Sequence, residues 1–140
     1  MEINIVNTKK ELENAYHVRT VVFIEEQGVS EEEEMDEFDE VAIHFVGYQN
    51  GAPVAASRMR FVDGYAKLER VCILKEERGK GFGRDIILFM EQIAKEKGYK
   101  ASKLNGQAYA ESFYQKLGYE TISGEFMDAG IPHVSMKKAF

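Results

Sequence analysis

Hydrophobic positions near the start of the chain predict a short strand followed by a helix. The strand covers residues 2–6, and the helix begins at Thr8, which forms a capping box with Glu11. Apolar residues continue at helical spacing through Leu12, Ala15, Tyr16, Val22 and Phe23. Arg19 falls within this apolar stripe. Because a cation at a core-facing position needs a partner, we expect Arg19 to meet a carboxylate or to line a cleft.

Two turn dipeptides divide the next part of the chain into three predicted strands. The strands cover residues 41–49, 52–62 and 65–74, and the dipeptides between them are Asn50-Gly51 and Asp63-Gly64. Asn-Gly and Asp-Gly favour two-residue hairpin turns because both turn positions require positive φ. The pattern therefore predicts a three-stranded antiparallel meander.

The C-terminal half alternates between predicted helices and strands. Apolar residues at helical spacing predict a helix over residues 83–97 that ends at Gly98, and another over residues 108–117 that ends at Gly118. Strands are predicted over residues 100–105, 119–126 and 133–137, with a loop over residues 128–132 before the last. This order of elements predicts one mixed α/β (α+β) domain over residues 1–140, with a mostly antiparallel central sheet and flanking helices.

The composition is that of an ordinary globular domain. Hydrophobic residues make up 44% and charged residues 30% of the 140 residues. No apolar run approaches the roughly 18 residues that a membrane-spanning helix needs, and the N-terminus lacks the pattern of a signal peptide. We therefore expect a cytoplasmic protein with no membrane partner. Cys72 is the only cysteine and the three histidines have no close spacing to it, so we expect neither a disulfide nor a metal site.

The charge is distributed unevenly along the chain. The net charge of −6 argues against a nucleic-acid partner, but ten acidic residues and no lysine or arginine lie between Arg19 and Arg58. The acidic segment over residues 31–40 is expected to be a loop or a short exposed helix. Acidic and basic regions could let a cation and a polyanion use different faces of the domain. A solvated loop without function is the alternative.

A glycine-rich turn joins the third strand of the meander to the next helix. It runs from Arg78 to Arg84 through Gly79, Lys80, Gly81, Phe82 and Gly83. Glycines let backbone N–H groups approach a ligand, and the start of a helix favours phosphate. A P-loop would need Ser or Thr after Lys80, and a dinucleotide-binding turn would need Gly or Ala at Arg84, so neither motif fits.

The segment Arg78-x-x-Gly81-x-Gly83 resembles the pyrophosphate-binding motif of the GNAT superfamily of acyl-CoA-dependent N-acyltransferases. Upstream, residues 69–74 look like the fourth strand of that family. Downstream, residues 110–119, with Phe113-Tyr114, look like its late helix. A narrower resemblance, to the ElaA/YjcF-type branch, rests on Arg19, Val22, Phe23, Glu26, Gln27, Glu34, Asp36, Asp39, His44 and residues 128–133. The resemblance implies a GNAT-like fold with splayed central strands.

This resemblance also implies a function and a cofactor site. The protein would be an N-acetyltransferase that moves an acetyl group from acetyl-CoA directly to an amine in a ternary complex. The turn from Arg78 to Arg84 would hold the phosphates, and the backbones of Val71, Cys72 and Ile73 would hold the pantetheine arm. Cys72 itself is expected to be a small core side chain, because no activating base is evident nearby in sequence.

Several side chains are candidates for catalysis or for binding the acceptor. By resemblance, Tyr114 would protonate the departing thiolate; the alternative is an aromatic core residue. Glu69 and His133 are candidates for the general base, although water could carry the proton and Glu69 could instead be a carboxylate paired with arginine. The remaining candidates are Asn105 and Gln107, as cofactor contacts or helix-entry hydrogen bonders, and Arg19, Glu26 and Gln27, as an acceptor wall.

Other functions remain open from the sequence. A GNAT-like domain could bind acyl-CoA or a protein partner without turnover, or it could use another acyl group or an alcohol acceptor. The acceptor itself, whether a small amine or a peptidyl amine, is not specified. A homodimer could form through an edge strand or through residues 31–40.

Overall fold

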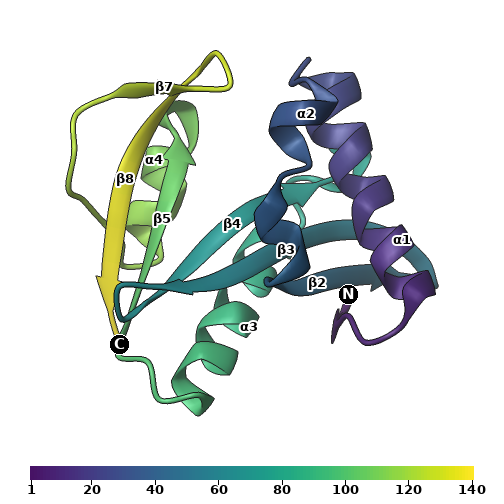
Figure 1. The fold of residues 1–140 in the computed structure, drawn as a ribbon, viewed down its shortest axis with the longest axis horizontal. Helices are drawn as coiled ribbons and strands as arrows, with labels where there is room; N and C mark the ends of the chain where they lie inside the picture. Colours follow the sequence, from purple (N-terminus) through teal and green to yellow (C-terminus); the bar gives the residue numbers. More distant parts are fainter.

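The computed structural model describes residues 1–140, which form an open eight-stranded sheet with helices on both faces (Figure 1). The strand order is β1-β2-β3-β4-β5-β8-β6, with β7 paired to β8. The strands are β1 (Glu2–Ile5), β2 (Ile43–Gln49), β3 (Ala52–Val62), β4 (Tyr65–Ile73), β5 (Ala101–Gln107), β6 (Glu120–Thr121), β7 (Phe126–Asp128) and β8 (Ile131–Ala139). Only the β4–β5 pair is parallel.

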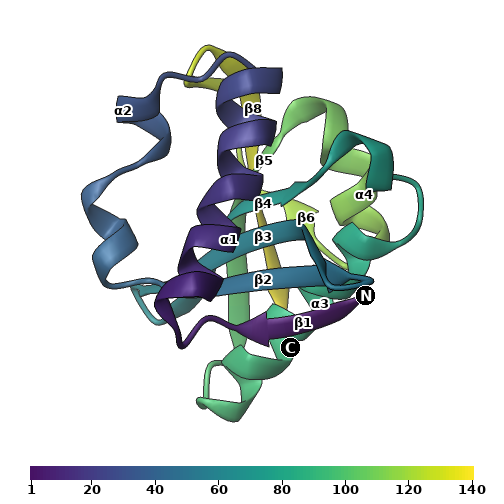
Figure 2. The ribbon, with the colours of Figure 1, turned by 90° about the vertical axis from the view of Figure 1, so that its right-hand side faces the viewer.

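Helices cover both faces of this sheet. The α-helices are α1 (Lys9–Arg19), α2 (Glu31–Glu34), α3 (Phe82–Glu96) and α4 (Glu111–Lys116). The other helical segments are the π-helix η1 (Thr20–Glu26) and the 3₁₀ turns η2 (Glu37–Glu40), η3 (Lys75–Glu77) and η4 (Ala108–Ala110). Helix α1 crosses β2, β3 and β4 on one face (Figure 2), whereas α3 packs on β3 and β4 from the other. No helix has the length and apolar character that crossing a membrane requires.

The predicted meander and its turns are confirmed. Asn50 and Gly51 adopt φ values of 53° and 81°, and Asp63 and Gly64 adopt 52° and 81°. Both pairs of values are those of hairpin turns whose twist matches the strands. The mixed α/β fold, with one parallel pair in a mostly antiparallel sheet, is also as predicted.

Three local predictions are wrong. The predicted strand over residues 119–126 is interrupted, because only Glu120–Thr121 and Phe126–Asp128 form strands. The helix does not continue regularly past Arg19, because residues 20–26 are wound as a π-helix. The segment 128–132 is not a loop, because Ala129 (φ 51°) and Gly130 (φ 76°) make a tight turn between β7 and β8. His133 therefore lies within a strand, where the sheet fixes its position.

The two faces of the sheet bury separate apolar clusters. Under α3, Ile86 and Met90 pack with Phe45, Met59 and Leu104, among fifteen buried residues. Under α1, the smaller cluster consists of Ala15, Val18, Val22, Val46, Ala56 and Cys72. Burial of these side chains from both faces fixes β2, β3 and β4 as a rigid platform.

The sheet opens between β4 and β5. These strands pair only where Ala66–Leu68 meet Ser102–Leu104, although both strands continue beyond that point. Strand β4 also carries an extra residue relative to β3, because Ala56 pairs with Cys72 whereas Arg58 pairs with Glu69. Arg70 lies in this bulge with φ 56°, a conformation that costs about 1 kcal/mol for a residue with a side chain. The splay and the bulge leave one edge of β4 without a neighbouring strand.

Candidate active site

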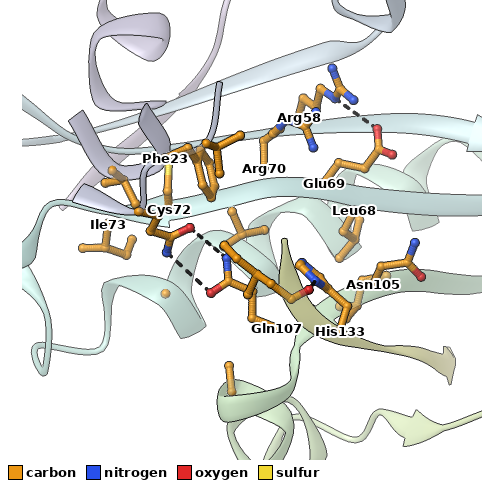
Figure 3. A pocket seen from close by; sticks show the side chains of 18 of the residues that line it. Phe23, Arg58, Leu68, Glu69, Arg70, Cys72, Ile73, Asn105, Gln107 and His133 are labelled. Carbon is orange, nitrogen blue, oxygen red and sulfur yellow. Dashed lines mark hydrogen bonds and ion pairs between the residues drawn. The ribbon is translucent and has the colours of Figure 1, made fainter. Parts of the chain in front are cut away.

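A cleft of about 860 Å³ occupies the space between the diverging strands. Figure 3 shows side chains from β4, β5 and β8 that face it. The predicted site residues that line it are Gln27, Glu69, Val71, Cys72, Ile73, Arg78, Gly79, Gly81, Phe82, Gly83, Arg84, Asn105, Gln107, Tyr114 and His133. Arg19, Glu26 and Lys80 do not line it. The tertiary fold thus brings most of the predicted site residues to one cavity.

The glycine-rich turn has the backbone conformation of an anion cradle. Gly79 and Gly81 adopt φ values of 79° and 83°, and no atom lies within 4 Å of the position that a Cβ would take at either. Helix α3 begins at Phe82 without a side-chain cap, and its first backbone bond runs from the Asp85 N–H to the Gly81 carbonyl. The N–H groups of the first turn therefore point outward without a protein acceptor. These features fit a phosphate group of CoA.

Two of the three cations of the turn, Arg78 and Lys80, are paired with carboxylates in this structure. Both terminal nitrogens of Arg78 donate to Glu26, each at 2.7 Å, while Arg78 Nε donates to the Ile73 carbonyl at 3.0 Å. Lys80 Nζ donates to Glu77 at 2.7 Å. Glu26 was predicted to form an acceptor wall, but it holds Arg78 instead. A phosphate in the cradle would compete with Glu26 for Arg78.

An amide pair spans the cleft above β4. The Gln107 side-chain nitrogen donates to Gln27 at 2.9 Å, and the Gln27 nitrogen donates to Gln107 at 3.5 Å (Figure 3). Asn105, two residues earlier on β5, accepts a hydrogen bond from the Ser135 hydroxyl at 2.8 Å. Its amide nitrogen thus faces the cleft as an available donor.

Tyr114 lies against β5 with its ring over a glycine. A Cβ at Gly106 would come within 2.9 Å of the Tyr114 ring, so only glycine at that position allows the close contact. Phe113 and Tyr119 pack edge-on against the same ring. Burial raises the pKa of the Tyr114 phenol well above its usual range. The hydroxyl therefore keeps its proton and can act as a donor.

His133 is oriented by its own strand. Its Nδ1 lies 2.7 Å from the Ile131 carbonyl, and its ring stacks on Phe126. Because a carbonyl oxygen only accepts, Nδ1 carries the hydrogen, and Nε2 of the neutral ring has a free lone pair. His133 pairs in register with Gln107, so it lies at the same level of the cleft. This geometry suits a proton acceptor.

Glu69 is paired with arginines, which is the alternative to its predicted role as general base. It accepts from Arg58 Nε at 3.0 Å and from Arg60 Nε at 2.8 Å, and Lys67 Nζ lies 3.5 Å away. Burial acts to raise its pKa, but the bonds and charges of the two arginines outweigh burial, and the pKa lies below its usual value. A carboxylate held in its charged form by three cations is a poor general base.

Arg19 is buried beneath the acidic segment and does not reach the cleft. Its guanidinium binds Glu34 at 2.9 Å and Asp39 at 2.8 Å, which confirms the prediction of a carboxylate partner. On the adjacent strands, Arg58 binds Asp36 and Asp39, and Arg70 binds Glu34. The expectation of an exposed, solvated segment is wrong for Glu34, which is 2% exposed. Arg19 therefore positions α2 and η2 instead of binding the acceptor.

The Asp36 pairing predicts a specific loss of stability in acid. Hydrogen bonds from Arg58 lower the pKa of Asp36 from 3.8 to about 2. Because the folded-state pKa is depressed, Asp36 contributes stability above about pH 4 that is lost as the pH falls toward 2. We expect Asp36→Asn to be less stable by about 2 kcal/mol at pH 7, with the difference vanishing below pH 2. Urea unfolding across pH measures this, and Glu37→Gln, on the same exposed segment, should change nothing. An equal loss at every pH would contradict it.

Cys72 belongs to the core, as predicted. Its thiol donates to the Ala56 carbonyl at 3.6 Å, and burial raises its pKa to about 12. A thiol with such a pKa is protonated at neutral pH and is a weak nucleophile.

Comparison with known proteins identifies the family. Residues 8–140 match the acetyltransferase (GNAT) domain, and the chain belongs to this family. It is 50% identical to the uncharacterized protein YyaT of Bacillus subtilis, over 99% of this chain and 95% of that protein. It is 44% identical to the uncharacterized N-acetyltransferase YjcF of Bacillus subtilis, over 99% of each.

Solved structures agree with this assignment. A crystal structure from Lactobacillus plantarum superposes with a TM-score of 0.91 at 30% identity, covering 99% of this chain and 97% of that one. The ElaA structure from Escherichia coli superposes with a TM-score of 0.84 at 23% identity, covering 98% of each. The predicted GNAT fold and the resemblance to the ElaA/YjcF-type branch are therefore confirmed.

Proposed function

We propose that this acetyltransferase uses acetyl-CoA and transfers the acetyl group directly to an amine in a ternary complex. The observation that carries the proposal is one cleft that joins an uncapped glycine-rich turn to an oriented histidine and a half-buried tyrosine. An aminoglycoside 6′-N-acetyltransferase complexed with coenzyme A has the same fold, with a TM-score of 0.79 at 14% identity, covering 99% of this chain and 97% of that one.

The residues present fit a CoA molecule along β4. The N–H groups from Gly81 to Arg84 would hold the pyrophosphate, with Arg78 and Arg84 adding positive charge. The pantetheine arm would pair with the edge of β4 from Val71 to Ile73, which the splay leaves without a partner strand. Asn105 and Gln107 would contact the arm from β5. Bound acetyl-CoA supplies the activated thioester.

The chemistry of the transfer divides between two side chains. His133 Nε2 accepts the proton that the acceptor nitrogen loses as its bond to the acetyl carbon forms. The Tyr114 hydroxyl donates a hydrogen bond to the sulfur as the carbon–sulfur bond breaks, which stabilises the departing thiolate until it takes a proton from solvent. Glu69 has no proton-transfer role, because its arginine partners keep it ionised. The predicted homodimer and cytoplasmic location stay predictions.

Titration calorimetry with acetyl-CoA, followed by a screen of amines for CoA release, tests the proposal. Saturable micromolar binding and amine-dependent release are expected. Binding without release for any amine would favour the non-catalytic binding module. No binding by folded protein would refute the cofactor assignment.

Removing the Tyr114 hydroxyl should slow turnover without weakening cofactor binding. We expect Tyr114→Phe to lower kcat about tenfold, because a hydrogen bond to a charged thiolate contributes roughly 1.5 kcal/mol. The dissociation constant for acetyl-CoA should stay unchanged. Tyr99→Phe is the matched control, since Tyr99 stacks on Phe61 and does not line the cleft. An unchanged kcat would reduce Tyr114 to a packing residue.

A further inference from the structure

A row of cations crosses four adjacent strands on the cleft side of the sheet. Arg60 pairs in register with Lys67, Lys67 with Lys103, and Lys103 with Lys137. Register partners project from the same face of a sheet, about 5 Å apart. Like charges directly opposite one another destabilise a sheet. Four of them in one row therefore require a compensating anion.

Internal carboxylates do not supply enough of that compensation. The three acids of the acidic segment, Glu34, Asp36 and Asp39, are bound by the three arginines Arg19, Arg58 and Arg70. Glu69 is left to Arg60 and Lys67, and it also binds Arg58.

The two lysines at the far end of the row have no ion-pair partner. Lys103 and Lys137 lie over the Tyr65 ring, at 4.4 and 5.0 Å from its centre, and Lys137 pairs in register with Glu120. Both lysines are half-buried. A hydrogen bond from Lys137 to the Tyr65 phenol lowers the pKa of that phenol, and the charges of Lys137 and Lys103 lower it further.

A second cavity of about 230 Å³ lies beside Lys103. Lys67 and Lys103 line it together with Tyr65, Asn105, Ser135 and one acidic residue, Asp63, which is exposed on the β3–β4 turn. Lys67, Leu104 and Asn105 line both this cavity and the main cleft, so the two spaces adjoin.

The same face connects the cavity to the proposed reaction centre. Along β8, His133, Ser135 and Lys137 alternate on this face, and along β5 Gln107, Asn105 and Lys103 do the same. Figure 3 shows His133, Gln107 and Asn105 side by side on these strands. His133 and Lys137 are four positions apart along the strand, which corresponds to about 13 Å.

We propose that the acceptor is an amine carrying an anionic group, a carboxylate or a phosphate, which binds in this second cavity against Lys67 and Lys103. The inference rests on the proposed function and specifies its substrate class. The amine of the acceptor lies at His133. The part of the acceptor between its amine and its anionic group spans about 10 Å, which is less than the separation along the strand because the lysine side chains reach toward the ligand. This basic end replaces the acceptor wall that was expected from Arg19, Glu26 and Gln27, since Arg19 and Glu26 are held in ion pairs and do not line the cleft.

Calorimetry on the full chain saturated with CoA tests the charge preference directly. Two probe pairs differ only in the anionic group: 8-aminooctanoate with its carboxamide, and aminohexyl phosphate with aminohexanol. A fifth probe, 1,8-diaminooctane, carries a second cation in place of the anion. Each acid should bind about fivefold more tightly than its uncharged counterpart, and the stronger of the two acids identifies the anion. In Lys103→Gln this ratio should fall below about two, whereas Lys10→Gln, an exposed lysine on α1, should retain it.

Each other outcome overturns the inference. Equal affinity for acid and uncharged probe, tighter binding of the diamine, or no saturable binding of any probe would each exclude an anion-binding acceptor site. A ratio that survives in Lys103→Gln would place the anion elsewhere. Failure of the proposed function is separate, because it would appear earlier, as absence of acetyl-CoA binding.

Discussion

Gly81→Glu is expected to weaken CoA binding on the order of a hundredfold or more. Gly81 lies at the N-terminus of α3 with φ 83°, and open space surrounds the position where a side chain would start. A glutamate there would place a carboxylate among the N–H groups that would otherwise bind phosphate, and would repel the anionic ligand. Titration calorimetry measures the loss, and circular dichroism checks that the fold is retained.

Gly81→Ala separates the charge from the backbone effect. Alanine imposes the same strain of about 1–2 kcal/mol at positive φ but adds no carboxylate. It should lower the melting temperature much as glutamate does and should keep most of the CoA affinity. Full affinity in Gly81→Glu would mean that the turn is structural only. Equal loss in both variants would assign the effect to the backbone.

His133→Gln is expected to lower kcat by about a hundredfold or more, the usual contribution of a positioned general base. Glutamine is close in size and polar, but it has no nitrogen that can accept the proton of the acceptor. The dissociation constant for acetyl-CoA should be unaffected, because His133 lies on β8, across the cleft from the phosphate turn. Steady-state kinetics with the best amine found in the screen measures the change.

His17→Gln provides the matched control for this experiment. His17 is exposed on α1 and lies outside the cleft, so the same substitution there should leave kcat unchanged. An unchanged kcat in His133→Gln would assign proton removal to water. A loss of acetyl-CoA affinity equal to the loss of kcat would indicate a structural role for His133.

The main elements of the fold were predictable from local sequence patterns. Asn50-Gly51 and Asp63-Gly64 specify hairpin turns by their own backbone preferences, and these turns set the register of the meander. Helix α3 follows from an apolar face at helical spacing and ends before Gly98. A final pair of strands was predicted, but the tight turn of the β7–β8 hairpin was missed because Ala129-Gly130 places alanine rather than asparagine or aspartate at a positive φ.

The candidate site was predictable only where its residues lie together in one short segment of the chain. The phosphate turn is contiguous, so its glycines and cations could be recognised together. Glu69 could not be distinguished from His133 as the base, because its arginine partners come from β3, about ten residues away along the chain. The signal that could have indicated this pairing is the presence of arginines at two alternate positions of the neighbouring strand, Arg58 and Arg60.

The sequence by itself determined the elements, the turns and the residue types of the segment proposed to bind phosphate, because these depend on neighbouring residues. Tertiary structure decided which charges remain available, because ion pairing depends on residues that meet only in the folded sheet. Arg19, Arg58 and Arg70 neutralise the acidic segment that dominates the composition. Strand register then aligns Lys67 and Lys103 from segments far apart in the chain, so a protein with net charge −6 presents a basic row beside its cleft.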